Sequence, residues 1–173
     1  FHERHLFLCY QGPQEWRSHV EAIYSDQLPG LLAAAIEARK PNLKKITKLT
    51  ICEAKDSMEA ALGDILIFPD MIRYRGLTNS DVDKFVDEVL VKEFELLPGS
   101  LEAIRGSYVF VCTDGDKRCN VCGPALIRRF EEEVEGKGLA EVSLNECSGA
   151  EIHKYAGHIM IFRSGATGEV TGH

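Results

Sequence analysis

Tyr108-Val-Phe-Val-Cys112-Thr-Asp-Gly-Asp-Lys-Arg-Cys119-Asn-Val-Cys122 is the stretch from which the fold of this 173-residue chain can be worked out. Its apolar start predicts a strand, a short charged loop follows, and a helix is predicted to begin near Cys119. Three of the six cysteines therefore lie where a strand meets a helix N-terminus. Helical N–H groups stabilise a thiolate there, so the stretch is suited to redox chemistry or metal ligation.

The two halves of the chain resemble each other around this stretch. Each half contains an apolar run that ends near a cysteine, then an amphipathic helix, then a second strand that reaches a cysteine, and then a third strand that ends in phenylalanine. The matched strands are His5–Tyr10 with Tyr108–Thr113, Ile46–Cys52 with Leu139–Cys147, and Gly63–Phe68 with Gly157–Phe162. The sequence therefore predicts one strand–helix–strand–strand unit that occurs twice.

Both units are expected to extend further. In the first half, Met71–Arg75 predicts a strand, and Thr78-Asn-Ser-Asp81 caps a predicted helix over Val82–Leu90. In the second half, Glu169-Val-Thr171 predicts the matching edge strand, and no helix follows it. Lys92–Ser100, which contains Leu-Pro-Gly, is the predicted linker.

This order of elements is that of a thioredoxin-like domain, a central sheet flanked by helices. We therefore predict an α/β protein with two thioredoxin-like modules in tandem, each a small mixed sheet flanked by helices. Residues 1–95 are the expected divergent N-terminal domain. Residues 101–173 are the expected second domain, without its last helix.

Composition narrows the class of protein. Hydrophobic residues make up 45% and charged residues 27% of the chain, as in globular proteins. The formal net charge of −7 argues against a nucleic-acid partner. No apolar run reaches the roughly 20 residues of a membrane span. A chain of this length does not need three disulfides, so we expect reduced cysteines and an intracellular compartment, with Cys9 and Cys52 as buried packing residues.

The cysteine spacing supports two kinds of chemistry. Cys119 and Cys122 form a Cys-x2-Cys pair at a helix start, which is typical of a thiol–disulfide oxidoreductase in which Cys119 attacks and Cys122 resolves. Lys117 and Arg118 would lower the thiol pKa. Against this interpretation, Tyr155-Ala-Gly-His158 contains no proline before the third strand of the module, where such enzymes carry a cis-proline.

Iron–sulfur ligation is the other possibility. Cys112 and Cys119 can face a common point across the loop between them. The end of the neighbouring predicted strand brings further sulfur and imidazole groups, since Cys147, His153 and His158 follow in order. Thiolates, or thiolates mixed with imidazoles, are the ligands that iron–sulfur clusters use.

Several motifs resemble those of the sucrase/ferredoxin-like family. In the second half they are Phe110-Val-Cys112, Asp116-Lys-Arg-Cys119, Val121-Cys-Gly-Pro124, His153-Lys-Tyr-Ala-Gly157 and Gly168-Glu-Val-Thr-Gly-His173. In the first half they are His5-Leu-Phe-Leu-Cys9-Tyr10, Lys48-Leu-Thr-Ile-Cys-Glu53, Asp64-Ile-Leu-Ile-Phe-Pro-Asp70 and Tyr74-Arg-Gly-Leu-Thr78. The resemblance implies a divergent N-terminal domain and a C-terminal thioredoxin-like ferredoxin domain. It also implies a [2Fe-2S] cluster held by two cysteines and two histidines.

Carried onto this chain, the resemblance makes Cys112, Cys119 and His153 cluster ligands. The family separates the two cysteines by eight residues and this chain by six. The first histidine of the family's His-x-Gly-Gly-His motif falls on Gly149, which has no side-chain ligand atom. Either Cys147 or His158 supplies the fourth ligand, or the cluster has been lost, or residues of this loop are missing from the sequence.

The resemblance therefore implies an electron carrier rather than an enzyme with its own substrate. The expected partner is a redox protein or a larger complex, in the cytosol, a mitochondrion or a plastid. Two alternatives stay open: a cluster-less structural subunit of a larger assembly, and the oxidoreductase that uses Cys119 and Cys122.

Overall fold

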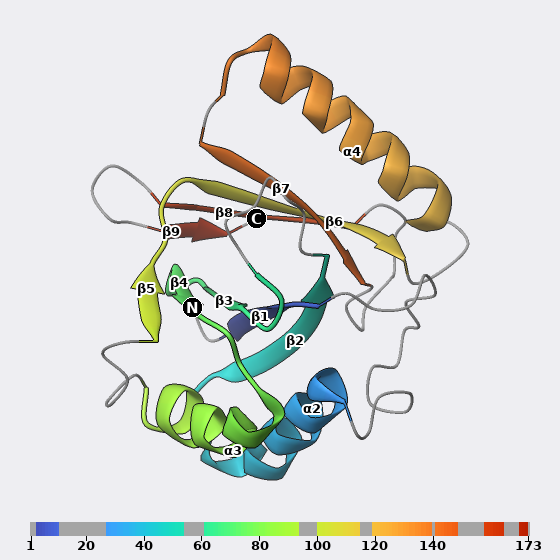
Figure 1. Ribbon diagram of the computed structural model, residues 1–173. Coiled ribbons are helices and arrows are strands. Elements are labelled where there is room, and N and C mark those ends of the chain that lie inside the picture. Colours follow the sequence, from blue (N-terminus) through green and yellow to red (C-terminus); the bar gives the residue numbers. More distant parts are fainter. Residues whose placement is uncertain are drawn as a thin grey trace.

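The computed structural model describes residues 3–10, 27–53, 61–93, 100–114, 119–139, 141–148, 158–164 and 170–172. These residues form a nine-stranded sheet with helices on its outer sides (Figure 1). The strands are β1 (Glu3–Cys9), β2 (Ile46–Cys52), β3 (Ile65–Phe68), β4 (Ile72–Tyr74), β5 (Leu101–Ala103), β6 (Ser107–Asp114), β7 (Val142–Ser148), β8 (Ile159–Ser164) and β9 (Val170–Gly172). The helical segments are α2 (Leu28–Arg39), η1 (Lys40–Asn42), η2 (Asn79–Asp81), α3 (Val82–Phe85), η3 (Val86–Val91) and α4 (Cys119–Gly136).

The predicted repeat is confirmed by the strand pairing. In the first half, β1 pairs in parallel with β2, β3 pairs antiparallel with β1, and β4 pairs antiparallel with β3, which gives the order β4-β3-β1-β2. In the second half, β6, β7, β8 and β9 repeat these pairings in the order β9-β8-β6-β7. The edge strand expected near residues 169–171 is β9.

The two halves share one sheet, which the sequence pattern did not indicate. Strand β2 pairs antiparallel with β7 through Cys52 and Cys147, so the nine strands run in the order β5-β4-β3-β1-β2-β7-β6-β8-β9. A second difference concerns β5. It lies at the start of the predicted second domain but pairs with β4 at the edge of the first half.

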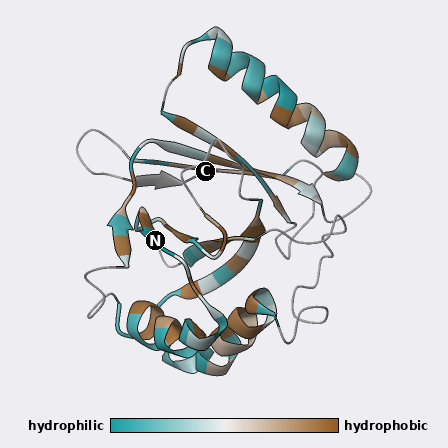
Figure 2. Ribbon diagram, in the orientation of Figure 1, coloured by the Kyte–Doolittle hydropathy of each residue, from teal (hydrophilic) through white to brown (hydrophobic). Residues whose placement is uncertain are grey.

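Because side chains alternate between the two faces of each strand, the molecule has four layers. They are α2 with α3 and η3, the two halves of the sheet, and α4. Leu6 and Leu8 of β1 pack on α2, α3 and η3, whereas Phe7 and Cys9 point to the opposite face. In the second half, Val109 and Val111 pack under α4 through Ile127. Figure 1 accordingly shows α4 on one outer side and α2 with α3 on the other, with the strands between them. Both of these outer layers mix hydrophobic and hydrophilic positions (Figure 2), as expected of helices with one buried face.

Aromatic side chains between the two halves of the sheet join the halves face to face. The rings of Phe7 and Phe110 stack with centroids 3.6 Å apart, and those of Phe68 and Phe162 stack at 4.5 Å. In the predicted repeat, Phe7 corresponds to Phe110 and Phe68 to Phe162. Each phenylalanine therefore meets its own equivalent, as expected for halves related by an approximate two-fold axis.

The helix predicted over Val82–Leu90 is present as a continuous helical run of η2, α3 and η3. It buries the apolar residues on which that prediction rested, namely Val82, Phe85, Val86, Val89 and Leu90. Most of the predicted linker, residues 94–99, lies outside the described residues.

Candidate functional site

The candidate site lies where β6 ends and α4 begins, as the sequence predicted. Strand β6 runs to Asp114, and α4 starts at Cys119. Gly123 in the first turns of α4 lies directly against the strand, because a Cβ atom there would be 2.5 Å from the Cys112 carbonyl oxygen and 2.7 Å from Thr113 Cα. Only glycine permits this approach, which keeps the helix N-terminus beside the strand end.

Three buried thiols gather at this point. Cys112, Cys119 and Cys147 have exposed fractions of 1%, 0% and 2%. Cys112 and Cys147 lie directly opposite each other on the parallel strands β6 and β7. Burial raises the pKa of the Cys147 thiol, and the nearby Cys112 and Cys119 thiols raise it further. The sequence made Cys147 one of two candidates for the fourth ligand, and in the structure it lies opposite Cys112 on the neighbouring strand.

The thiols belong to a longer row of cysteines across the sheet. Cys9 pairs with Cys52, Cys52 with Cys147, and Cys147 with Cys112, so four neighbouring strands each carry a cysteine at the same level. The Cys9 and Cys52 sulfur atoms are 3.5 Å apart. The hydrogen bond with Cys9, together with burial, raises the pKa of the Cys52 thiol. Both cysteines are fully buried, as predicted, but strand pattern alone did not indicate the row.

The structure describes His158, one of the two histidines of the predicted site, and not the other. His158 is exposed and immediately precedes β8; its backbone oxygen accepts a hydrogen bond from the Cys112 N–H at 2.9 Å. His153 and Gly149 lie outside the described residues, as do Lys117 and Arg118. Within the described part of the chain, no three His, Cys, Asp or Glu side chains have the spacing of a metal site.

The Cys-x2-Cys pair has the opposite accessibility to the one that the dithiol interpretation requires. Cys119, the expected attacking thiol, is fully buried, whereas Cys122 is exposed beside Val121, whose exposed fraction is 73%. A buried thiol cannot reach a substrate disulfide on another protein. None of the six cysteines, all within the described residues, forms a disulfide in the structure.

Comparison with known proteins assigns the family. The sucrase/ferredoxin-like family model matches residues 1–172, so the chain belongs to this family. Actin patches distal protein 1 of Saccharomyces cerevisiae is 27% identical over 128 residues. That match covers 62% of this chain and 40% of the yeast protein, so the chain corresponds to less than half of its relative. No solved structure matches the chain. Among the described residues, no helix is long and apolar enough to cross a membrane.

Proposed function

We propose that this protein transfers single electrons through a [2Fe-2S] cluster held in the second of two thioredoxin-like modules. The observation that carries the proposal is that Cys112, Cys119 and Cys147 are all buried in the region where β6 ends and α4 begins. Family membership adds support, because the cysteine motifs that suggested a cluster lie in the matched region. The repeated strand order of the two halves supports the thioredoxin-like assignment of each module.

Cys112, Cys119 and His153 are the proposed ligands from the sequence motifs. For the fourth ligand we favour Cys147 over His158. Cys147 is buried directly beside Cys112, whereas His158 is exposed. The donor set suits the group, since iron–sulfur clusters are bound by thiolates with or without imidazoles.

The cluster, when bound, supplies one-electron transfer, and an imidazole ligand raises its potential relative to an all-thiolate site. The chain buries the three cysteine ligands away from water. The hydrogen bond from the Cys112 N–H to the His158 backbone oxygen fixes the end of β6 against the start of β8. The glycine contact of α4 with β6 fixes Cys119 at the helix N-terminus, where backbone N–H groups stabilise a thiolate.

Iron and acid-labile sulfide in anaerobically purified protein test the proposal, together with visible absorption and EPR after reduction. We expect two irons and two sulfides per chain. Cys112→Ser and Cys119→Ser should lose most of the iron, and Cys122→Ser, which changes an exposed cysteine on the same helix, should keep it. Folded wild-type protein without iron would overturn the proposal.

The fourth ligand is tested by a pair of matched variants. If Cys147 is a ligand, Cys147→Ser should lose iron or shift the EPR spectrum, and His158→Gln should retain the wild-type spectrum. The reverse result would assign the position to His158. Unchanged spectra in both variants would exclude both residues.

A cluster-less interaction module is the second candidate, and one observation favours it: glycine stands at position 149, where the family has its first histidine. This alternative predicts folded, iron-free protein and no effect of Cys119→Ser on partner binding.

On the electron-transfer proposal, the partner of this protein is a redox protein or a larger complex. We place the protein in an intracellular compartment, because a chain of 173 residues does not need disulfides to stabilise its core.

A further inference from the structure

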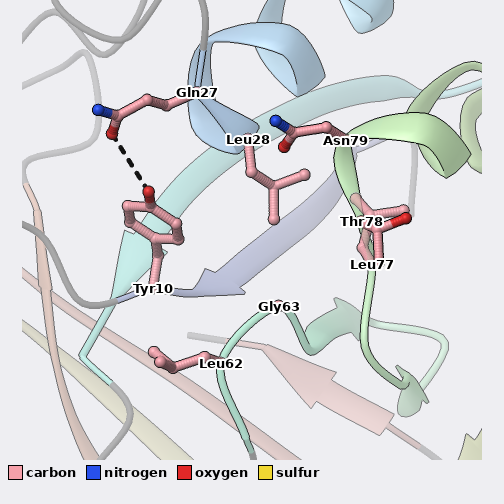
Figure 3. Close-up of a pocket in the computed structure, with 8 residues that line it drawn as sticks. All are labelled: Tyr10, Gln27, Leu28, Leu62, Gly63, Leu77, Thr78 and Asn79. Atoms are coloured by element: carbon pink, nitrogen blue, oxygen red, sulfur yellow. Dashed lines mark hydrogen bonds between the residues drawn. The ribbon is translucent and has the colours of Figure 1, made fainter.

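The first half contains a pocket at the place that corresponds to the cysteine site of the second half. The pocket, of about 390 Å³, lies at the end of β1, beside the start of α2 and the turn before β3 (Figure 3). In the repeat, β1 corresponds to β6, α2 to α4 and β3 to β8. Both halves carry cysteines where their first two strands end, but α2, unlike α4, contains no cysteine, and the pocket lies beside its start.

The framework of the pocket is fixed by backbone contacts. Gly63 adopts φ +85°, and a Cβ atom there would lie 2.8 Å from the Leu77 carbonyl oxygen. The Gly63 N–H donates to the Cys9 oxygen at 2.8 Å, and the Leu77 N–H donates to the Gly63 oxygen at 2.8 Å. These bonds hold the end of β1, the turn before β3 and the segment around Leu77 in fixed positions relative to one another.

Polar, uncharged side chains make up half of the described pocket lining. Figure 3 shows Tyr10 and Gln27 on one side and Thr78 and Asn79 on the other, with Leu28 between them. The Tyr10 hydroxyl donates to Gln27 Oε1 at 3.2 Å, which leaves the two N–H groups of that amide for another acceptor. The described lining residues contain no thiol, imidazole, carboxylate or cation.

Three leucines supply the apolar part of the lining: Leu28, Leu62 and Leu77. Leu77 is buried, whereas Leu62 has an exposed fraction of 55% at the pocket. Apolar walls with a few hydrogen-bonding groups are the usual composition of a small-molecule site, and the volume falls within the range of such sites.

We propose that this pocket binds an uncharged molecule that combines an apolar group of about leucine size with an amide or carbonyl. Burial of the apolar group against the leucines stabilises the complex, and the Gln27 and Asn79 amides orient the polar end of the ligand. A charged ligand is disfavoured because it would lose hydration without meeting an opposite charge on the described lining residues. The proposal does not depend on a cluster in the second half.

NMR titration of 15N-labelled protein with N-acetyl-leucinamide tests the proposal, with N-acetyl-leucine as the charged probe. We expect saturable shifts of the Gly63, Thr78 and Asn79 amide signals with the first probe. The carboxylate probe should bind about tenfold more weakly or worse. The same shifts are expected in Cys119→Ser.

Leu62→Trp should fill the pocket and abolish the shifts. Leu139→Trp is the matched control, since Leu139 is also an exposed leucine, with an exposed fraction of 48%, and lies just beyond the end of α4. It should bind as wild type does. The proposal fails if N-acetyl-leucinamide gives no saturable shifts, if both probes bind equally, or if Leu62→Trp retains binding.

Discussion

Asp64 is a buried carboxylate that holds two turns of the first half together. Its side chain accepts hydrogen bonds from the backbone N–H groups of Ala61 and Gly76, at 2.9 and 2.8 Å. It also forms an ion pair with Arg73, whose Nε lies 3.1 Å away and whose side chain is likewise buried. A charge pair in this position matters chiefly because loss of one member leaves the other buried without its counter-charge.

We predict that Asp64→Asn lowers the free energy of unfolding by about 3–5 kcal/mol, since Arg73 then loses its buried counter-charge and keeps the half-exposed Glu102 carboxylate at 4.0 Å. Urea denaturation measures the effect. Glu37→Gln is the control, because Glu37 and Lys40 form an exposed pair and its loss should change stability by at most about 0.5 kcal/mol. Equal effects of the two substitutions would contradict the role given to burial.

His5 should make stability depend on pH. Burial lowers the pKa of His5, and the positive charge of Lys48 lowers it further, against an opposing effect of Glu3. The unfolded chain therefore takes up the proton first as pH falls below about 6.5, and the folded state loses stability. We predict a shallower loss between about pH 7 and pH 5 in His5→Gln, measured by denaturation at several pH values. An unchanged slope would show that other groups dominate.

At the scale of elements, the start of α4 is fixed by one glycine. Gly123→Ala would place a methyl group within 3 Å of backbone atoms of Cys112 and Thr113, which cannot move aside as a side chain could. We predict a loss of about 1–3 kcal/mol in stability. Iron content should fall as well, because the helix N-terminus that carries Cys119 is pushed from β6.

Gly136→Ala is the matched control in the same helix. No atom lies within 4 Å of a Cβ at Gly136, and alanine favours helix by up to about 1 kcal/mol. This variant should be as stable as wild type or slightly more so, with unchanged iron. Retention of full stability and iron in Gly123→Ala would contradict the close contact.

The elements that the sequence predicted well are those with a strong local pattern. Ile46–Cys52 was predicted with the bounds of β2, and the apolar runs before Cys9 and Cys112 became β1 and β6. Strand β5 was missed because three residues at a sheet edge, only partly buried, leave little periodicity. The accessibility of Cys119 and Cys122 also depends on how α4 rests on the sheet, which spacing does not determine.

For the candidate site, sequence predicted the cysteines and their position at a strand end. It could not predict that Cys147 lies in register with Cys112, or that Cys52 and Cys9 continue the row, because strand pairing is long-range. The single antiparallel pairing between β2 and β7 likewise has no local signature. The histidine part of the site remains a prediction, since His153 lies outside the described residues.

At the scale of the whole molecule, stability depends on the layer between the halves. Phe7 and Phe110 are both fully buried there and stack at 3.6 Å. We predict that Phe7→Ala and Phe110→Ala each cost about 3–5 kcal/mol. The double variant should lose less than the sum of the two, by about 0.5–3 kcal/mol, because each ring loses its partner in either single variant.

The matched control is a pair of substitutions in separate layers. Ile127 of α4 and Leu32 of α2 belong to separate clusters on the two outer sides of the sheet, so the effects of Ile127→Ala and Leu32→Ala should add to within about 0.5 kcal/mol. Urea denaturation of all single and double variants measures both cycles. An additive Phe7 and Phe110 pair would mean that the two rings contribute independently.

The contacts between equivalent residues of the two halves have the geometry of a symmetric dimer. In a symmetric dimer, residues close to the two-fold axis contact their own copies in the partner subunit. Phe7 with Phe110, Phe68 with Phe162 and Cys52 with Cys147 are contacts of this kind within one chain. The two halves thus face each other as the subunits of a symmetric homodimer do. Both halves keep a cysteine near the end of their first strand, Cys9 and Cys112, and they differ at the start of the following helix, where only α4 carries cysteines.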